Sequence, residues 1–213
     1  LDHVFEIERF STAPSDKTPA RAYRPFSGGM SANAAIAAAR LGARVRFFGA
    51  VGDDDAGRFA LGKLADEGID TAGVQRVAGG ATSVSAVVVD ARGHRQIFNH
   101  RGNALALAAP LDTRALTGTD FLLSDPRWAA GAEAALRWAL EAGVPSMFDG
   151  DIAPVADLRR LGGLATWAVF SAPGLALLAP GLARDDGLAT LLAAGAREVV
   201  VTDSEQGLWW RSA

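Results

Sequence analysis

The chain has 213 residues, of which 49% are hydrophobic and 21% are charged, and its formal net charge is −3. These proportions fit a globular protein with one substantial core, so we expect one domain over residues 1–213. Acidic and basic residues are interspersed, which argues against nucleic acid or a membrane surface as a partner.

Cysteine is absent and only three histidines occur, so we expect no disulfide and no metal held by a cluster of protein ligands. The sequence shows no signal peptide and no long apolar span, which suits the cytoplasm.

The chain opens on an apolar alternation over residues 1–7, which predicts the second half of a strand. Neither an initiating Met nor a loop precedes it, so we expect the native chain to begin earlier. Residues 11–19 are a polar connection that contains proline, and residues 21–26 are extended again.

Two glycines, Gly28 and Gly29, then turn the extended segment into a small-residue helix expected over residues 34–41. Glycine tolerates positive φ and lets a ligand approach the backbone, while the N–H groups of the first helical turn stay free. Asn33 carries an amide that both donates and accepts hydrogen bonds, which suits hydroxyl groups. Two interpretations follow from these residues alone: a site for an oxygen-rich ligand, or a plain tight turn.

The next segments are a strand over residues 44–51, a Gly-Asp-Asp turn, a helix that ends near residue 68, and a loop over residues 71–80. Alternation at period two then predicts a hairpin of residues 82–90 and 94–100 with its bend at Gly93.

The second half alternates strands with helices, as βα units do. We expect strands over residues 120–124, 144–151, 166–171 and 198–202, and helices over residues 111–116, 131–142, 158–163 and 188–195. Apolar runs that end in charge mark the carboxyl ends of parallel strands, where open α/β sheets bind ligands. Trp209 and Trp210 fall on a returning strand, where we interpret them as packing residues.

The order of Gly28-Gly29, Asn33, a helix closing in Leu-Gly, and a strand leading to Gly52-Asp53-Asp54 resembles the first signature of the PfkB (ribokinase-like) family of sugar kinases. The resemblance implies an α/β fold of the ribokinase-like type: three α/β/α layers with a mostly parallel central sheet. It also implies a small β-lid formed by about residues 8–27 and 82–103, and a homodimer that pairs through this lid.

The activity implied is ATP-dependent transfer of the γ-phosphoryl group to a hydroxyl of a small-molecule sugar, with ATP and Mg²⁺ as cofactors. The substrate-binding positions implied are Asp2, Gly28, Gly29, Asn33, Asn99, Arg101, Asp125 and Arg127. A carboxylate such as that of Asp2 accepts hydrogen bonds from two neighbouring hydroxyls, although an ordinary strand-end Asp is the alternative.

Arg101 and Arg127 suit an anionic substituent on the sugar, because a guanidinium pairs with carboxylate or phosphate in two places at once. The alternatives are a structural ion pair of Arg127 with Asp125, and an Arg101 that is turned to solvent.

The nucleotide-binding positions implied are Ser171, Thr202, Ser204 and Gly207, and two of them depart from the family pattern. Ser171 begins a Ser-Ala-Pro-Gly segment where the family has Asn-x-x-Glu, and Ser204 replaces a glycine. The Gly-Ala-Gly-Asp segment, which in the family holds the phosphate and supplies the catalytic base, does not occur in these 213 residues. We therefore expect the base beyond Ala213 and no activity from the chain as given.

Three other functions compete with this one. A nucleoside kinase of the same fold would treat ribose as a sugar with a base attached, and a non-catalytic sugar-binding relative would explain the missing segment. A Rossmann dehydrogenase is weaker, because Gly-Gly-x-x-x-Asn is not the Gly-x-Gly-x-x-Gly of that fold.

Overall fold

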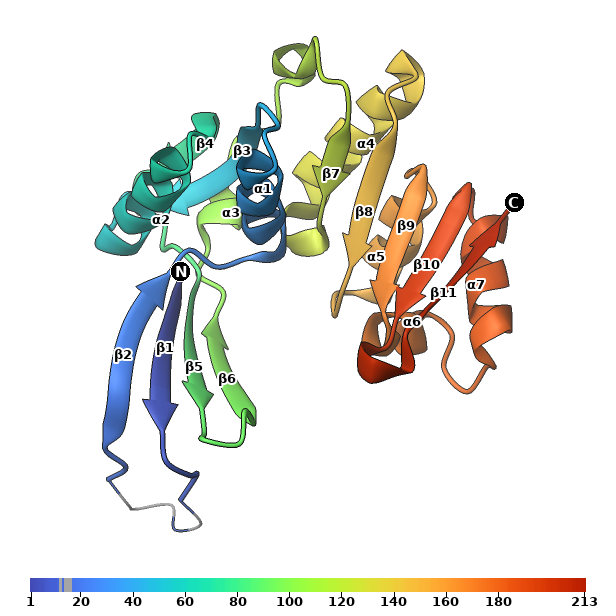
Figure 1. The fold of residues 1–213 in the computed structure, drawn as a ribbon. Helices are drawn as coiled ribbons and strands as arrows, with labels where there is room; N and C mark the ends of the chain where they lie inside the picture. The colour runs from blue at the N-terminus through green and yellow to red at the C-terminus, as the bar shows by residue number, and fades with distance from the viewer. Residues whose placement is uncertain (12, 14–16) are drawn as a thin grey trace. The chain divides into compact units, whose positions relative to one another are not determined.

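The structure is a computed structural model that describes residues 1–11, 13 and 17–213. The polar connection predicted over residues 11–19, and with it part of the predicted lid, includes residues 12 and 14–16, which lie outside the described residues. Contacts divide the chain into two compact units, Leu1–Ala109 and Pro110–Ala213, which are described in turn (Figure 1). The single domain predicted over the whole chain stays a prediction.

A four-stranded sheet forms one part of the first unit, with the strand order β2-β1-β5-β6. Its strands are β1 (Asp2–Ile7), β2 (Ala20–Phe26), β5 (Val84–Val89) and β6 (Arg95–His100). β1 is antiparallel to β2 and parallel to β5, and β5 is antiparallel to β6. The predicted hairpin is confirmed as β5 and β6, and Gly93 adopts a φ of 83° at its bend.

The rest of the first unit consists of α1 (Met30–Arg40), β3 (Arg46–Gly52), α2 (Asp55–Asp66), β4 (Asp70–Val77) and α3 (Ala104–Leu107). β3 and β4 pair in parallel, and a small core of Ala32, Ala35, Leu64 and Ile69 holds the helices beside them. Small alanine side chains on α1 allow this close packing.

The loop predicted over residues 71–80 is wrong, because most of that segment is β4. Gly73 and polar side chains hide the strand pattern in the sequence. A Cβ built on Gly73 would lie 2.4 Å from Cδ1 of Phe48, so the glycine makes room for that ring on the neighbouring strand. The short helix α3 was also not predicted.

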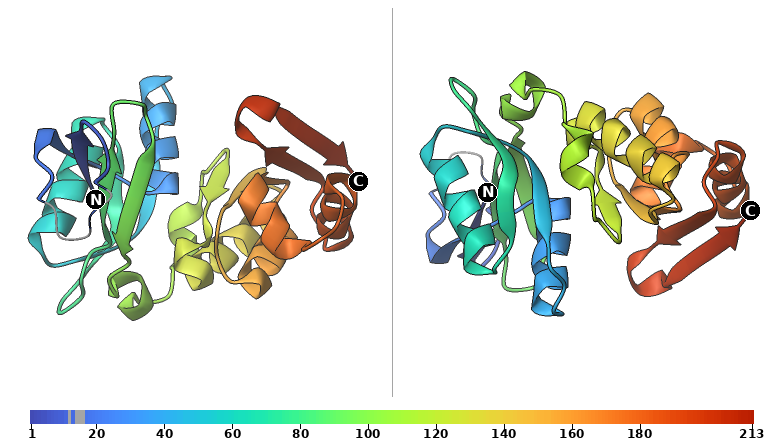
Figure 2. Two further views of the ribbon diagram at one scale, coloured as in Figure 1. Left: turned by 90° about the horizontal axis from the view of Figure 1, so that it is seen from below. Right: turned by 90° about the horizontal axis from the view of Figure 1, so that it is seen from above.

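The second unit is built on a five-stranded sheet with the order β11-β10-β9-β8-β7. β7 (Leu122–Ser124), β8 (Ser146–Gly150), β9 (Trp167–Ser171) and β10 (Glu198–Thr202) run parallel. β11 (Leu208–Ser212) returns antiparallel beside β10 (Figure 2), which confirms the returning strand predicted at the two tryptophans.

The helices of this unit are α4 (Ala129–Ala142), α5 (Val155–Gly162), α6 (Ala172–Leu178) and α7 (Arg184–Ala193). Alternate residues of β8 and β9 are fully buried, among them Phe148 and Phe170, so these residues share one face of the sheet. The four helices pack against the strands, and Leu136, Leu158 and Leu191 complete the core.

Three short 3₁₀ turns, Thr113–Leu116, Pro126–Trp128 and Ser204–Gln206, link these elements, and the first takes the place of the helix predicted over residues 111–116. The helix α6 was not predicted, although Pro173 in its first turn is a position where proline is favoured. No helix within the described residues is both long enough and apolar enough to cross a membrane.

Candidate functional site

The turn after β2 passes directly against the carboxylate of Asp2, the first residue of β1. A Cβ built on Gly28 would lie 2.3 Å from Oδ2 and 2.5 Å from Oδ1 of Asp2, so a larger residue would displace this carboxylate. Gly29 has a φ of 104° and precedes α1, where the Asn33 N–H donates to the Gly29 carbonyl at 3.0 Å. The turn therefore places Gly28 against Asp2, and Gly29 and Asn33 follow at the start of α1.

Three polar side chains form a row across the four-stranded sheet. Asp2 is paired with Ser85 on β5, and Ser85 is paired with Asn99 on β6. Residues paired in this way share one face of a sheet, and Asn99 Nδ2 donates to Ser85 Oγ at 3.1 Å. The row presents a carboxylate, a hydroxyl and an amide beside the Gly28 turn. Arg101 follows β6 and is exposed.

Ser85 was missed by the sequence analysis, although it lies between two predicted positions. The alternation over residues 82–90 predicts the strand that contains Ser85, but it does not predict that this strand pairs with β1. The pairing of β1 with β5 joins residues far apart in sequence, as the hydrogen bond from the Leu1 backbone nitrogen to the Ser83 carbonyl also shows (3.0 Å).

In the second unit, polar groups gather where β7 and β8 end. Asp125 Oδ1 accepts a hydrogen bond from the backbone N–H of Arg127 at 2.8 Å. The Arg127 guanidinium donates to the Ile152 carbonyl at 3.0 Å and lies 3.4 Å from Asp151 Oδ2. Two protein acceptors thus orient the guanidinium, and the hydrogen bond to Asp125 comes from the Arg127 backbone.

Asp149 on β8 was not among the predicted site residues, although it lies in the acidic strand end that the sequence showed. Burial raises its pKa, the charges of Asp125 and Asp151 raise it further, and Arg127 opposes them. Within residues 1–11, 13 and 17–213, no group of three or more His, Cys, Asp or Glu side chains is placed to hold a metal ion.

The predicted nucleotide positions fall at the ends of β9 and β10, where Ser171 and Thr202 are paired. Ser171 Oγ accepts from the Gly174 N–H at the start of α6 and donates to Asp151 Oδ1, both at 3.1 Å. Ser204 and Gly207 lie in the turn between β10 and β11, with φ values of 45° and 91°. Ser204 is the one non-glycine residue with a positive φ in the part of the chain that the structure describes.

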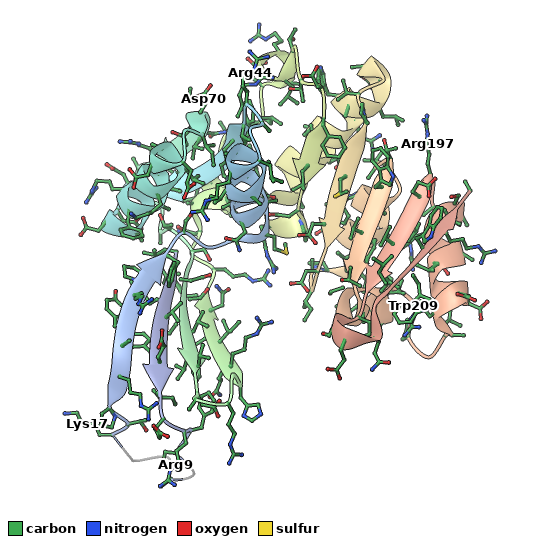
Figure 3. The ribbon with its side chains drawn as sticks, in the orientation of Figure 1. Arg9, Lys17, Arg44, Asp70, Arg197 and Trp209 are labelled. Atoms are coloured by element: carbon green, nitrogen blue, oxygen red, sulfur yellow. The ribbon has the colours of Figure 1, made fainter. Side chains whose placement is uncertain are left out.

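Of the two tryptophans predicted to pack, Trp209 does so, whereas Trp210 is 66% exposed because it lies on the edge strand β11. The guanidinium carbon of Arg184, at the start of α7, lies 3.4 Å from the centre of the Trp209 ring, and Arg184 also donates to Asp203 Oδ2 at 3.2 Å. Figure 3 labels Trp209 on β11, beside α7.

The figure also labels Arg9 and Lys17, which lie at the end of the four-stranded sheet farthest from the Gly28 turn.

Comparison with known proteins gives the class of this chain. Residues 2–213 match the model of the pfkB family carbohydrate kinases. Ribokinase of Haemophilus influenzae is 38% identical over 88 residues, which are 41% of this chain and 28% of the relative. Fructokinase-1 of rice, Oryza sativa subsp. japonica, is 42% identical over 82 residues, or 38% of this chain and 25% of the relative. The matched parts thus span about a quarter of these relatives.

Solved structures agree with this class. A protein of Agrobacterium tumefaciens assigned as a ribokinase superimposes with a TM-score of 0.92 at 31% identity, covering 100% of this chain and 70% of the other. Arabidopsis thaliana ribokinase, solved with ribose and ATP, gives a TM-score of 0.79 at 20% identity over 99% of this chain and 71% of the other, which shows the fold alone. The chain belongs to the pfkB family of carbohydrate kinases, and the predicted ribokinase-like α/β fold is confirmed.

Proposed function

We propose that the protein is an ATP-dependent sugar kinase. The observation that carries this proposal is the row of Asp2, Ser85 and Asn99 beside the Gly28 turn. Carboxylate, hydroxyl and amide groups form the hydrogen bonds that sugar hydroxyls need. The names of the relatives, ribokinase and fructokinase, support a pentose or hexose as the substrate class.

In the proposed reaction a base removes the proton of a sugar hydroxyl, the oxygen attacks the γ-phosphorus of ATP, and the bond to the β–γ bridging oxygen breaks. In the first unit, Asp2, Gly28, Gly29 and Asn33 are proposed to orient the sugar, with Asn99 and Arg101 as further positions. In the second unit, Asp125 and Arg127 stay proposed substrate positions. The base is proposed to be an Asp outside these 213 residues, because no Gly-Ala-Gly-Asp segment occurs within them. The chain as given is then inactive.

The nucleotide is proposed to lie against Ser171, Thr202, Ser204 and Gly207. Mg²⁺ usually keeps several waters and binds phosphates together with one or two carboxylates. At the end of β8, the Asp151 carboxylate and the Ser171 hydroxyl would hold such an ion together with the phosphates, in place of the contact of Asp151 with Arg127. When bound, Mg²⁺ would neutralise charge on the phosphates.

The four-stranded sheet is proposed to serve as the lid that excludes water from phosphoryl transfer. Its face opposite the Asp2 row carries an aromatic cluster, in which the rings of Phe5 and Tyr23 lie 5.1 Å apart. Tyr23 and Phe98 remain 51% and 58% exposed, which supports pairing with a second copy through this face. We place this kinase in the cytoplasm.

The direct test measures ADP release by the protein encoded in full, with D-ribose, D-fructose, inosine and D-fructose 6-phosphate. We expect one of the sugars to stimulate ADP release, and Asp2→Asn to lower kcat/KM about 100-fold, because charge-assisted hydrogen bonds to two hydroxyls are lost. Asp66→Asn, on the exposed end of α2, is the matched control.

The other outcomes separate the alternatives. Stimulation by inosine alone identifies a nucleoside kinase, and a preference for the phosphorylated sugar supports the anionic substrate suggested by Arg101 and Arg127. Sugar binding without ADP release identifies a non-catalytic relative. Activity of the 213-residue chain alone would refute the proposed location of the base.

A further inference from the structure

The carboxylate of Asp54 joins two parts of the first unit. Asp54 precedes α2, and its Oδ1 accepts a hydrogen bond from the Gly57 N–H at 2.7 Å, the usual bond of a helix N-cap. Its other two bonds come from Thr82: the backbone N–H donates to Oδ2 at 2.8 Å and the hydroxyl donates to Oδ1 at 2.7 Å. Capping α2 needs only the first of these three.

Thr82 continues the network back to β3. Its side chain is buried, and its hydroxyl accepts from the Gly52 N–H at 2.8 Å while it donates to Asp54. The backbone is equally tight here, because a Cβ on Gly52 would lie 2.3 Å from the Gly80 carbonyl oxygen. The residues around the Gly-Asp-Asp turn therefore fix where residues 80–82 run.

The segment held by Asp54 leads into β5 and is hydrogen-bonded to the residues that flank β1 and β6. Thr82 leads into β5 and Ser85, and the Ser83 carbonyl accepts a hydrogen bond from the Leu1 backbone nitrogen, immediately before Asp2. Asn103, which follows Asn99 and β6, accepts from the Ala81 N–H at 2.7 Å through Oδ1 and donates its own N–H to the Ala81 carbonyl at 3.1 Å. Residues 81–83 are thus the common support of β1, β5 and β6.

We propose that Asp54 is a positioning residue for the sugar site: by holding residues 81–83 against α2 and β3, it sets the row of Asp2, Ser85 and Asn99. It does not touch the sugar itself. The inference rests on the proposed function for its substrate and on the first unit alone for its geometry.

The charge of Asp54 suits this role. Although burial raises its pKa, the hydrogen bonds from Thr82 and Gly57 hold the pKa of Asp54 below its ordinary value, so the carboxylate is ionised at neutral pH. The neighbouring Asp53 offers a matched control, because it is exposed and its nearest cation, Nη1 of Arg58, lies 3.6 Å away.

The test uses the protein encoded in full and four variants: Asp54→Asn, Thr82→Val, Thr82→Ser and Asp53→Asn. Thr82→Val leaves the Gly57 cap intact and removes only the hydroxyl, whereas Thr82→Ser keeps it. For Asp54→Asn and Thr82→Val we expect amide hydrogen exchange about tenfold faster at residues 81–85 and 100–104, and unchanged exchange in β10. Thr82→Ser and Asp53→Asn should match the wild type.

Kinetics give the second readout, with whichever of D-ribose and D-fructose the wild type phosphorylates. We expect Asp54→Asn and Thr82→Val to raise KM for the sugar about tenfold while kcat changes less than about twofold. The reason is that both substitutions disturb sugar binding and leave the transfer of the phosphoryl group unaffected. Rescue by Thr82→Ser separates positioning from a general loss of stability.

The inference is overturned if Asp54→Asn or Thr82→Val accelerates exchange only at the start of α2, or lowers the melting temperature while KM and exchange at residues 100–104 stay at wild-type values. If Asp54→Asn does not fold, Thr82→Val decides. If the wild type phosphorylates neither sugar, the proposed function fails. Hydrogen exchange at residues 100–104 then still tests whether Asp54 positions residues 81–83.

Discussion

The two units treat the motifs of their family differently. In the first unit two signature residues have a clear structural use: Gly28 admits the Asp2 carboxylate, and Asp54 ties Thr82 to α2. In the second unit two motif positions are filled by other residues. Ser171 caps α6 and binds Asp151, and Ser204 holds a φ of 45° where the family has glycine.

This difference indicates in which unit the motif positions tolerate substitution. Close approach of the backbone to a carboxylate leaves no room for a side chain, so the Gly28 turn is specified by sterics. A turn that needs a positive φ accepts serine at a cost in free energy only. Substitution of Gly28 should therefore weaken sugar binding, whereas substitution of Ser204 should shift stability.

The largest effect is expected for Gly28→Ala. The new Cβ would lie 2.3 Å from Asp2 Oδ2, so the carboxylate must turn away, and we expect kcat/KM for the sugar to fall about 100-fold. Gly62→Ala in α2 is the control, because a Cβ added at Gly62 would have no neighbouring atom within 4 Å. This substitution should raise the free energy of unfolding by about 0.5–1 kcal/mol. Wild-type values of kcat/KM for Gly28→Ala would contradict the proposed steric requirement for glycine at this turn.

The next largest effect is expected for Asn33→Ala, which should weaken sugar binding without lowering the stability of the protein. Loss of a sugar contact should cost about 1–3 kcal/mol in calorimetric affinity. Because Asn33 is exposed in the first turn of α1 and alanine is the better helix former, the melting temperature should not fall. Unchanged affinity would remove Asn33 from the site.

The sequence predicted the order of strands and helices because that order depends on local patterns such as the hairpin around Gly93. It did not predict β4, since Gly73 fits under Phe48 only in the folded sheet. Ser85 was missed for a related reason: its place between Asp2 and Asn99 depends on strand pairing between distant segments. Asp54 was seen as part of a signature, but its bonds to Thr82 required the structure.

In the second unit, Ser204→Gly should raise stability by about 0.5–1 kcal/mol, because glycine adopts a positive φ without the steric cost that serine carries. In thermal unfolding of the protein encoded in full, Ser204→Ala is the control and should bring no gain. An equal gain from alanine would show that the backbone conformation is not the cause.

The smallest effect is expected for Asp149→Asn, and it should depend on pH. Burial and the neighbouring Asp125 and Asp151 raise the pKa of Asp149, so the folded state binds its proton more tightly than the unfolded state, and stability falls as pH rises through the folded pKa. Asp149→Asn should therefore stabilise the protein by about 1 kcal/mol or less at pH 7.

This gain should vanish below the ordinary aspartate pKa of about 3.9, where the carboxyl is protonated in both states. Asp120→Asn, at an exposed position before β7, should leave the melting temperature unchanged at either pH. A gain for Asp149→Asn that persists in acid would assign the effect to packing and not to charge.

The central proposal is that the sugar binds at the Gly28 turn and the row of Asp2, Ser85 and Asn99. The most direct measurement is a two-dimensional NMR titration of the protein encoded in full with D-ribose and with D-fructose. We expect the amide signals of Gly28, Gly29, Asn33 and Ser85 to shift on addition of the sugar, and these shifts to be lost in Asp2→Asn. Saturable shifts confined to the second unit, or shifts at the turn that persist in Asp2→Asn, would contradict this proposal.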